Sequence, residues 1–221
     1  MGLPTSLSFL RTGTGDQTLD VYLEPLCPFS YKMAKSLEAN VLPHVREGGK
    51  YHGKLQLVVR IYAQPFHYFS AFPCEAILVF CNQHPDLFWE YLMAAFAIQD
   101  AWFNKEVKDK TPLQCQQAYV DVALDILDKH GRLPAGPRSK AAGEWIDKLQ
   151  VHDKANGGSS MFMDLKYLAR EGRQNGIHFT PTVLLNGLED GTVSSSFGKD
   201  DWDKYLADKL NESAQGQQAR M

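Results

Sequence analysis

The stretch that decides the fold is Leu23-Glu24-Pro25-Leu26-Cys27-Pro28-Phe29-Ser30. Residues 18–23 before it alternate and are rich in β-formers, which predicts a strand. Pro28 suits the first position of a helix, where its missing N–H costs nothing. Apolar residues then recur at helical spacing over 29–45 (Met33, Leu37 and Val41). We therefore predict a strand that turns directly into a helix, with Cys27 at the junction.

Outward from this stretch, residues 55–62 form a nearly continuous apolar run, which is typical of a strand buried on both faces. Strand, helix and strand in this order make a βαβ unit, and its functional loop follows the first strand. Helical patterns then fill the chain from residue 73 to about residue 153. We expect these helices at 74–81, 85–98, 112–130 and 139–149.

The last quarter returns to mixed structure. A helix should follow Gly157-Gly158-Ser159-Ser160 and run to Gly176, and residues 182–185 read as a short strand. Asn186-Gly187 is a hairpin-turn signal, so we expect a partner strand that ends at 196–198. An amphipathic helix over 200–210 precedes a polar tail.

Composition excludes several classes of protein. The chain has 221 residues with 44% hydrophobic and 22% charged residues, which is typical of a globular protein. Its formal net charge of -3 shows no basic excess, so we expect no nucleic-acid partner. The first residues lack the basic and apolar regions of a secretory signal, and no stretch has the ~18 apolar residues of a membrane span. We therefore expect no membrane association and a cytoplasmic location with reduced thiols.

Cys27 is the candidate nucleophile. A helix N-terminus favours an anion, and the thiolate is the reactive form of cysteine. Ser30 lies one helical turn further on, so its hydroxyl could hydrogen-bond to the sulfur. Because serine cannot form a disulfide, a mixed disulfide on Cys27 needs an external thiol or another cysteine of the chain. The alternative for Cys27 is a buried, inert thiol.

Two segments together resemble the thioredoxin superfamily, specifically its DsbA-like branch. This branch includes kappa-class glutathione transferases and 2-hydroxychromene-2-carboxylate isomerases. The matching segments are 23–30 and Phe179-Thr180-Pro181-Thr182-Val183-Leu184-Leu185-Asn186-Gly187, with a helical insertion of suitable length between them. The resemblance implies an α/β thioredoxin-like fold whose domain is discontinuous. We place that domain at 15–72 and 158–212, the all-helical insertion at 73–157 and a flexible tail at 213–221.

The resemblance also implies roles for site residues. In the family the proline at position 181 is cis and packs beside the active cysteine, and the backbone at Thr180 hydrogen-bonds to a peptide or to glutathione. Pro28 and Phe29 border the same site. Gln64-Pro65-Phe66-His67 is similar to a Gln-Pro-Trp-His stretch in DsbA-like proteins, in which His67 could orient a substrate or act as a base. Glu75 could pair with His67.

The departures from the family narrow the chemistry. Dithiol DsbA oxidants have a second active-site cysteine where this chain has Ser30, and kappa transferases have serine where it has Cys27. Cys-Pro-Phe-Ser is instead similar to the sites of monothiol glutaredoxins and omega-class transferases. We therefore expect a thiol oxidoreductase or glutathione-dependent transferase that uses Cys27 alone, with glutathione as co-substrate and a small-molecule or thiol substrate.

Two other functions remain open. One is a glutathione-assisted isomerase of an aromatic or polyketide-like secondary metabolite. Its pocket would be lined by aromatic residues of the insertion (Phe88, Trp89, Tyr91, Phe96, Trp102 and Phe103). The other is a thioredoxin-like binding module without catalytic activity. Cys74 is a further candidate, as the residue that resolves a mixed disulfide on Cys27.

Other expectations concern metal, location and assembly. The histidines are scattered and no cysteine pair has zinc spacing, so we expect no metal. Ala219-Arg220-Met221 loosely resembles a peroxisomal address, which is the alternative to a cytoplasmic location. A homodimer is left open.

Overall fold

The centre of the molecule is a pair of parallel strands, β2 (Gln17–Leu23) and β3 (Leu55–Ile61). The computed structural model describes residues 2–152 and 154–218. Both predicted strands are confirmed. Successive side chains of a strand point to opposite faces. Val21 therefore packs in the main hydrophobic core, whereas its neighbour Tyr22 packs with Ile177 on the other face.

Three shorter strands complete the sheet, in the order β1-β3-β2-β4-β5. β4 (Thr182–Leu185) pairs antiparallel with β2 and turns at Asn186-Gly187, where both residues have positive φ, as the hairpin signal predicted. The predicted partner strand ending at 196–198 was wrong, because β5 (Leu188–Glu189) pairs with β4 directly after the turn. The 3-10 helix η1 (Thr5–Leu10) and β1 (Arg11–Gly13) were not predicted, since so short a segment has no readable alternation.

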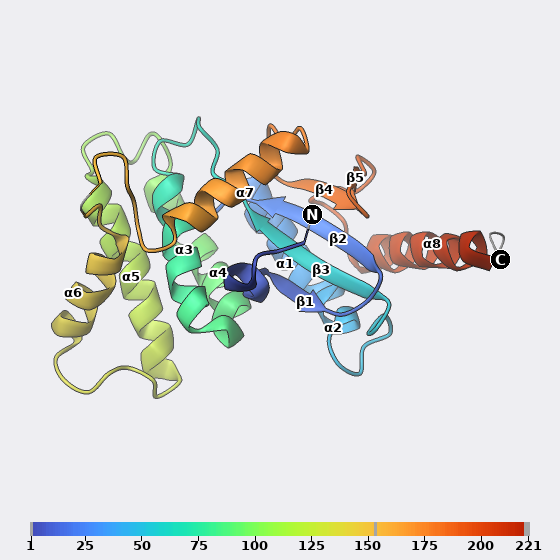
Figure 1. The fold of residues 1–221 in the computed structure, drawn as a ribbon, viewed down its shortest axis with the longest axis horizontal. Coiled ribbons are helices and arrows are strands. Elements are labelled where there is room, and N and C mark those ends of the chain that lie inside the picture. The colour runs from blue at the N-terminus through green and yellow to red at the C-terminus, as the bar shows by residue number, and fades with distance from the viewer. Residues whose placement is uncertain (1, 153, 219–221) are drawn as a thin grey trace.

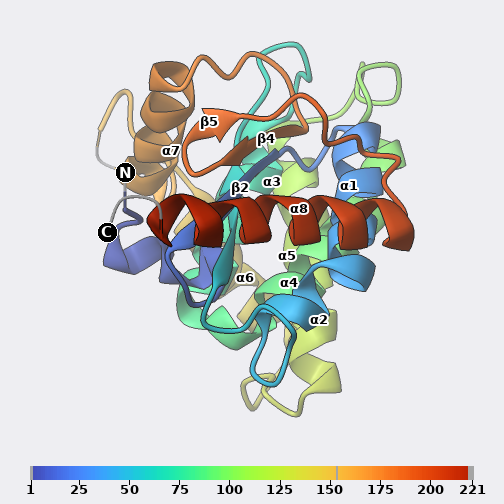
Figure 2. The same ribbon diagram turned by 90° about the vertical axis from the view of Figure 1, so that its right-hand side faces the viewer.

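Helices cover both faces of the sheet (Figures 1 and 2). α1 (Pro28–Asn40) and α8 (Lys199–Gln218) pack against each other on one face. α7 (Phe162–Gln174) crosses the other face and contacts β3. Gly172 allows this close approach, because a Cβ there would lie 2.4 Å from the ring of Tyr62.

Two predicted helices differ in extent from the observed ones. The helix expected over 29–45 breaks at Val41 into α1 and α2 (Leu42–Val45). Pro43 has no N–H to continue the hydrogen-bond ladder, and a proline ring in a helix interior clashes with the preceding turn. The last helix was expected to end at residue 210, but α8 continues to Gln218.

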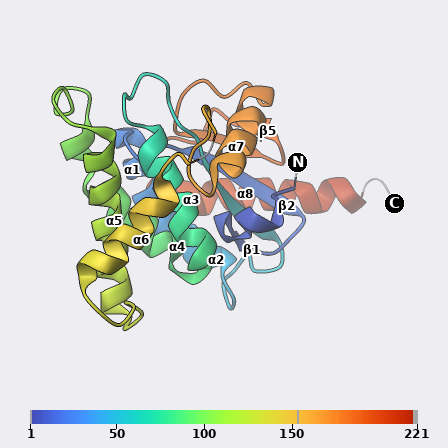
Figure 3. The same cartoon turned by 60° about the vertical axis from the view of Figure 1, so that its left-hand side comes forward.

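Between β3 and α7 the chain forms a helical layer beside the sheet (Figure 3). It contains α3 (Ala71–Gln83), η2 (Pro85–Leu87), α4 (Phe88–Ala97), η3 (Gln99–Trp102), α5 (Pro112–Lys129) and α6 (Arg138–Leu149). The helices predicted near residues 74–81, 112–130 and 139–149 are confirmed, and the one predicted over 85–98 is divided into η2 and α4. α4 packs against α1, so this layer adjoins the end of the sheet where Cys27 lies. Within the described residues, no helix has the length and apolarity needed to cross a bilayer.

Candidate active site

Cys27 is the N-cap residue of α1, and Pro28 is the first residue of the helix, as the sequence predicts. The backbone of Cys27 is extended, with φ -91° and ψ 118°. The first hydrogen bond of the helix runs from the Tyr31 N–H to the Cys27 carbonyl, at 3.1 Å. The N–H groups before Tyr31 have no partner within the helix, and the helix dipole gives this end a partial positive charge. The sulfur of Cys27 therefore lies where a helix favours an anion.

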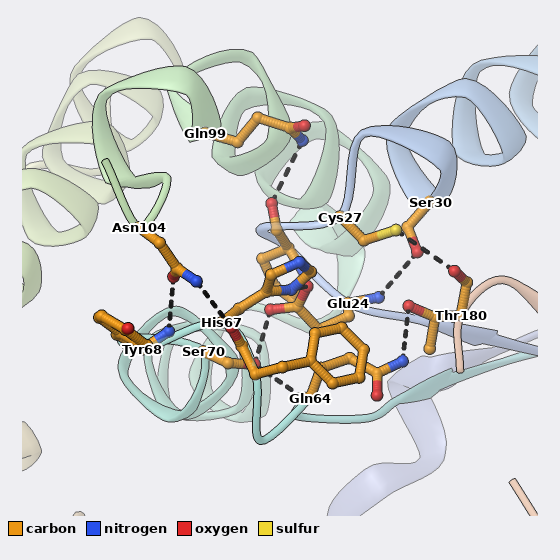
Figure 4. Close-up of polar contacts among 12 residues, drawn as sticks. Glu24, Cys27, Ser30, Gln64, His67, Tyr68, Ser70, Gln99, Asn104 and Thr180 are labelled. Carbon is orange, nitrogen blue, oxygen red and sulfur yellow. Dashed lines mark hydrogen bonds and ion pairs between the residues drawn. The ribbon is translucent and has the colours of Figure 1, made fainter. Parts of the chain in front are cut away.

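The segment before β4 lies directly against this sulfur (Figure 4). The Cys27 thiol donates a hydrogen bond to the carbonyl oxygen of Thr180, with the two heavy atoms 3.3 Å apart. The peptide bond between Thr180 and Pro181 is cis, as the resemblance implies. The structure thus brings together two segments that are 153 residues apart in sequence.

Ser30 is fully buried one turn into α1, but its hydrogen bond is not the expected one. Its Oγ accepts a hydrogen bond from the backbone N–H of Glu24 at 3.2 Å, whereas helical spacing predicted a hydrogen bond to the sulfur of Cys27. This bond closes the turn between β2 and α1. Ser30 therefore positions the backbone that leads to Cys27.

Glu24 is a buried carboxylate beneath the site, and it was not among the site residues predicted from the sequence. Its Oε1 accepts a hydrogen bond from the Ser70 hydroxyl at 2.6 Å, and its Oε2 lies 2.6 Å from Nδ1 of His67. The side chain of Glu24 is fully buried, and that of His67 is 22% exposed. Buried charges are costly unless they are paired and hydrogen-bonded, and this carboxylate has both kinds of partner. The signal available in the sequence was a charged residue directly after a buried strand.

Gln64 connects this cluster to the segment before β4. Its Nε2 donates to Oγ1 of Thr180 at 3.1 Å, and its backbone N–H donates to Oγ of Ser70 at 2.9 Å. A chain of hydrogen bonds therefore runs from Glu24 through Ser70 and Gln64 to Thr180, the residue that contacts Cys27. The structure brings His67 into this cluster, as the Gln-Pro-Phe-His stretch suggested.

The expected pairing of Glu75 with His67 was wrong. Glu75 accepts a hydrogen bond from the backbone N–H of Ser159 at 3.3 Å, and His67 is paired with Glu24. Burial raises the pKa of Glu75. Glu75 therefore joins α3 to the segment before α7 and has no part in the site.

The helical insertion holds the loop that carries His67. The side-chain amide of Asn104 donates to the carbonyl of Phe66 at 2.7 Å and accepts from the N–H of Tyr68 at 2.9 Å. On the other side of the site, Nε2 of Gln99 donates to the carbonyl of Pro25 at 3.2 Å. The insertion therefore fixes both backbone segments that surround Glu24.

Exposed aromatic side chains come from the three segments that form the site. They are between 46% and 72% exposed, although large hydrophobic residues are usually buried. Phe29 follows Pro28 on α1, Phe66 and Tyr68 flank His67, and Phe179 precedes Thr180. These four side chains present apolar surface to solvent on the segments that carry Cys27, His67 and Thr180.

The other three cysteines lie in the core of the insertion. All four cysteines are free thiols, and Cys74, Cys81 and Cys115 are fully buried, whereas Cys27 is 6% exposed. Burial raises the pKa of Cys74 and Cys81 well above the usual value and that of Cys115 to about 12. A thiol that is buried in apolar surroundings is a poor nucleophile. Cys74 thus lacks the properties of a resolving cysteine.

The remaining candidates from the sequence do not assemble into a second site. Five of the six aromatic residues expected to line a pocket in the insertion are buried in the hydrophobic core (Phe88, Trp89, Tyr91, Phe96 and Trp102). Within residues 2–152 and 154–218, no three histidine, cysteine or acidic side chains are grouped so as to hold a metal ion. Ala219-Arg220-Met221 lies outside the described residues.

The burial pattern predicts selective alkylation of the native protein. Iodoacetamide at pH 7 should modify Cys27 alone, because the other three thiols are buried and have raised pKa values. All four should react after unfolding in guanidinium chloride. Peptide mass spectrometry measures both states, and native labelling of Cys74 at the rate of Cys27 would contradict this description.

Comparisons with known proteins agree with the observed architecture. No family model and no curated protein matches the chain. Among solved structures, it is similar to a Pseudomonas syringae protein provisionally described as a protein-disulfide isomerase, with 23% identity and a TM-score of 0.61 over 92% of this chain and 99% of that one. It is also similar to BdbD from Bacillus subtilis, with 14% identity and a TM-score of 0.60 over 95% of this chain and 97% of that one. DsbA from Chlamydia trachomatis is similar too, with 16% identity and a TM-score of 0.57 over 96% of each chain. The chain thus has a thioredoxin-like fold with a helical insertion, the fold of DsbA proteins.

Proposed function

We propose that this protein is a thiol–disulfide oxidoreductase that acts through Cys27 alone and uses glutathione as the second thiol. The observation that carries the proposal is the position of the Cys27 sulfur, at the N-terminus of α1 and 3.3 Å from the Thr180 carbonyl. The names of the structural neighbours, a protein-disulfide isomerase and a DsbA, support thiol–disulfide chemistry.

The reaction has two exchange steps. The Cys27 thiolate attacks the glutathione sulfur of a mixed disulfide R–S–S–G; a bond forms between Cys27 and glutathione, and the thiolate RS⁻ leaves. Because Ser30 cannot resolve this adduct, a glutathione thiolate attacks it and releases oxidised glutathione and the Cys27 thiolate. The sum converts R–S–S–G and one glutathione into RSH and oxidised glutathione. A reducing compartment that supplies glutathione suits this chemistry.

The backbone at Thr180 is suited to hold the glutathione group. None of the hydrogen bonds among the described residues uses the Thr180 N–H, so it is available to a ligand. The Thr180 carbonyl is released as an acceptor when Cys27 loses its proton. Pro28, Phe29 and Pro181 would contact the ligand beside the sulfur.

Replacement of Cys27 tests this function directly. Cys27→Ser should abolish glutathione-dependent reduction of hydroxyethyl disulfide, because a neutral hydroxyl does not attack a disulfide under these conditions. The assay couples oxidised glutathione to NADPH consumption by glutathione reductase. Cys74→Ala is the matched control and should keep the wild-type rate.

The possible outcomes separate the alternatives. Turnover that survives Cys27→Ser would show that another group carries the reaction. A folded wild-type protein without turnover would favour the binding module. Loss of turnover in Cys74→Ala would restore Cys74 as a resolving cysteine.

Introducing a second cysteine should change the reaction. Ser30 is buried one helical turn from Cys27, and residues three apart on a helix are neighbours. Ser30→Cys should allow an internal disulfide and let the protein oxidise a reduced dithiol peptide, which the wild type should not do. Measurement of peptide oxidation by mass spectrometry tests this; equal oxidation by wild type and variant would mean that Ser30 does not limit the reaction.

A further inference from the structure

The pairing of Glu24 with His67 has a chemical consequence beyond the burial of a carboxylate. A carboxylate only accepts hydrogen bonds, so the 2.6 Å contact with Oε2 of Glu24 fixes the proton of His67 on Nδ1. Nε2 is then the ring nitrogen that exchanges protons with other groups. No hydrogen bond among the described residues uses Nε2, and the His67 side chain is partly exposed.

The position of the imidazole is fixed from several directions. The His67 N–H donates to the carbonyl of Gln64 at 3.3 Å, and the His67 carbonyl accepts from the N–H of Ser70 at 3.0 Å. Asn104 holds the residue on each side of His67 through its amide. Figure 4 draws His67 against Glu24, whose backbone carbonyl accepts a hydrogen bond from the N–H of Cys27 at 3.0 Å. An imidazole held this firmly is preorganised for proton transfer.

Of the described titratable groups near Glu24, His67 is the one that can carry a positive charge opposite the carboxylate. Cys74 and Tyr119 also interact electrostatically with Glu24. Burial raises the pKa of both side chains well above the usual value, so the thiol and the phenol remain neutral. Ser70 supplies a neutral hydrogen bond. Within the described part of the chain, His67 is the one ion-pair partner of Glu24. The carboxylate therefore stabilises the imidazolium that forms when Nε2 takes up a proton.

We propose that Glu24 and His67 form an acid–base pair for thiol–disulfide exchange at Cys27, an inference that rests on the proposed function. In the first step Nε2 gives its proton to the leaving thiolate RS⁻, which departs as RSH. In the second step Nε2 takes the proton of the incoming glutathione thiol, and the resulting thiolate attacks the Cys27–glutathione disulfide. The protons balance over one turnover, because Nε2 gives one proton to RS⁻ and takes one from the glutathione thiol, while Glu24 keeps its contacts with His67 and Ser70.

The dependence on the leaving group distinguishes this role from a structural one. A thiol of low pKa leaves readily as a thiolate, whereas an alkyl thiol gains from protonation. The experiment measures single-turnover formation of the Cys27–glutathione adduct from two substrates, the mixed disulfides of glutathione with thionitrobenzoate and with 2-mercaptoethanol. His67→Ala should slow the mercaptoethanol reaction about 10²-fold, within the range typical of general acid catalysis. It should change the thionitrobenzoate reaction less than about threefold, as expected when the leaving group needs no proton.

Two further measurements distinguish the loss of an acid–base group from misfolding of the variant. Imidazole added to His67→Ala should restore at least about a tenth of the rate lost with the mercaptoethanol substrate, because free imidazole replaces the missing acid. It should leave the rate with the thionitrobenzoate substrate unchanged. Glu24→Gln should show the same selectivity for the alkyl leaving group, since it removes the charge that stabilises the imidazolium. His52→Ala removes an exposed histidine away from the site and is the control that should behave as wild type.

The outcomes separate the two proposals. If the wild type reacts with both substrates but His67→Ala slows both equally, or neither, His67 has no acid–base role and the proposed function stands. If the wild type reacts with neither substrate, the proposed function fails and the acid–base role fails with it.

Discussion

The contact between the Cys27 sulfur and the Thr180 carbonyl joins two parts of the chain that are distant in sequence, and the sheet makes it possible. β2 and β4 are antiparallel neighbours, with Val21 opposite Val183 and Tyr22 opposite Thr182. Because β2 ends at Leu23 and β4 begins at Thr182, Glu24 and Thr180 both lie just beyond the same end of this strand pair. The turn that follows β2 then brings Cys27 against Thr180, so the pairing of β2 with β4 sets the geometry of the site.

The polar cluster beneath the sulfur follows from the same arrangement. Glu24 directly follows β2 and is fully buried, where an isolated charge would be unstable. Ser70 and His67 supply its hydrogen bonds, and Gln64 extends the network to Thr180. Because Gln99 and Asn104 tie the surrounding backbone to the helical insertion, that insertion supports the site as well as covering the core.

Much of the fold was readable from the sequence because its signals are local. Alternation identified β2, and Pro28 marked the start of α1. The cis peptide bond before Pro181 was implied only by the resemblance. Glu24 was missed because a charged residue after a strand normally reads as an exposed loop, and its burial depends on helices about 50 residues away. The partner of Ser30 was mistaken for a similar reason, since helical spacing relates Ser30 to Cys27 but carries no information on the turn backbone it contacts.

The aromatic residues of the insertion show that helical spacing alone does not predict whether a residue lines a pocket. Helical spacing is the same for residues that pack in a core and for residues that line a ligand pocket. Phe88, Tyr91 and Phe96 proved to be core. The exposed aromatic residues lie instead in the first turn of α1 (Phe29) and on the loops that carry His67 and Thr180 (Phe66, Tyr68 and Phe179), where no periodicity could mark them.

The most direct test of the account is the intact mass of the reduced protein after incubation with oxidised glutathione. A sulfur that reacts without an internal resolving thiol should give one glutathionyl adduct, located on Cys27 and persistent until free glutathione is added. An internal disulfide, seen as the loss of two hydrogens without an adduct, would contradict the account. So would a folded protein that gains no glutathione at all.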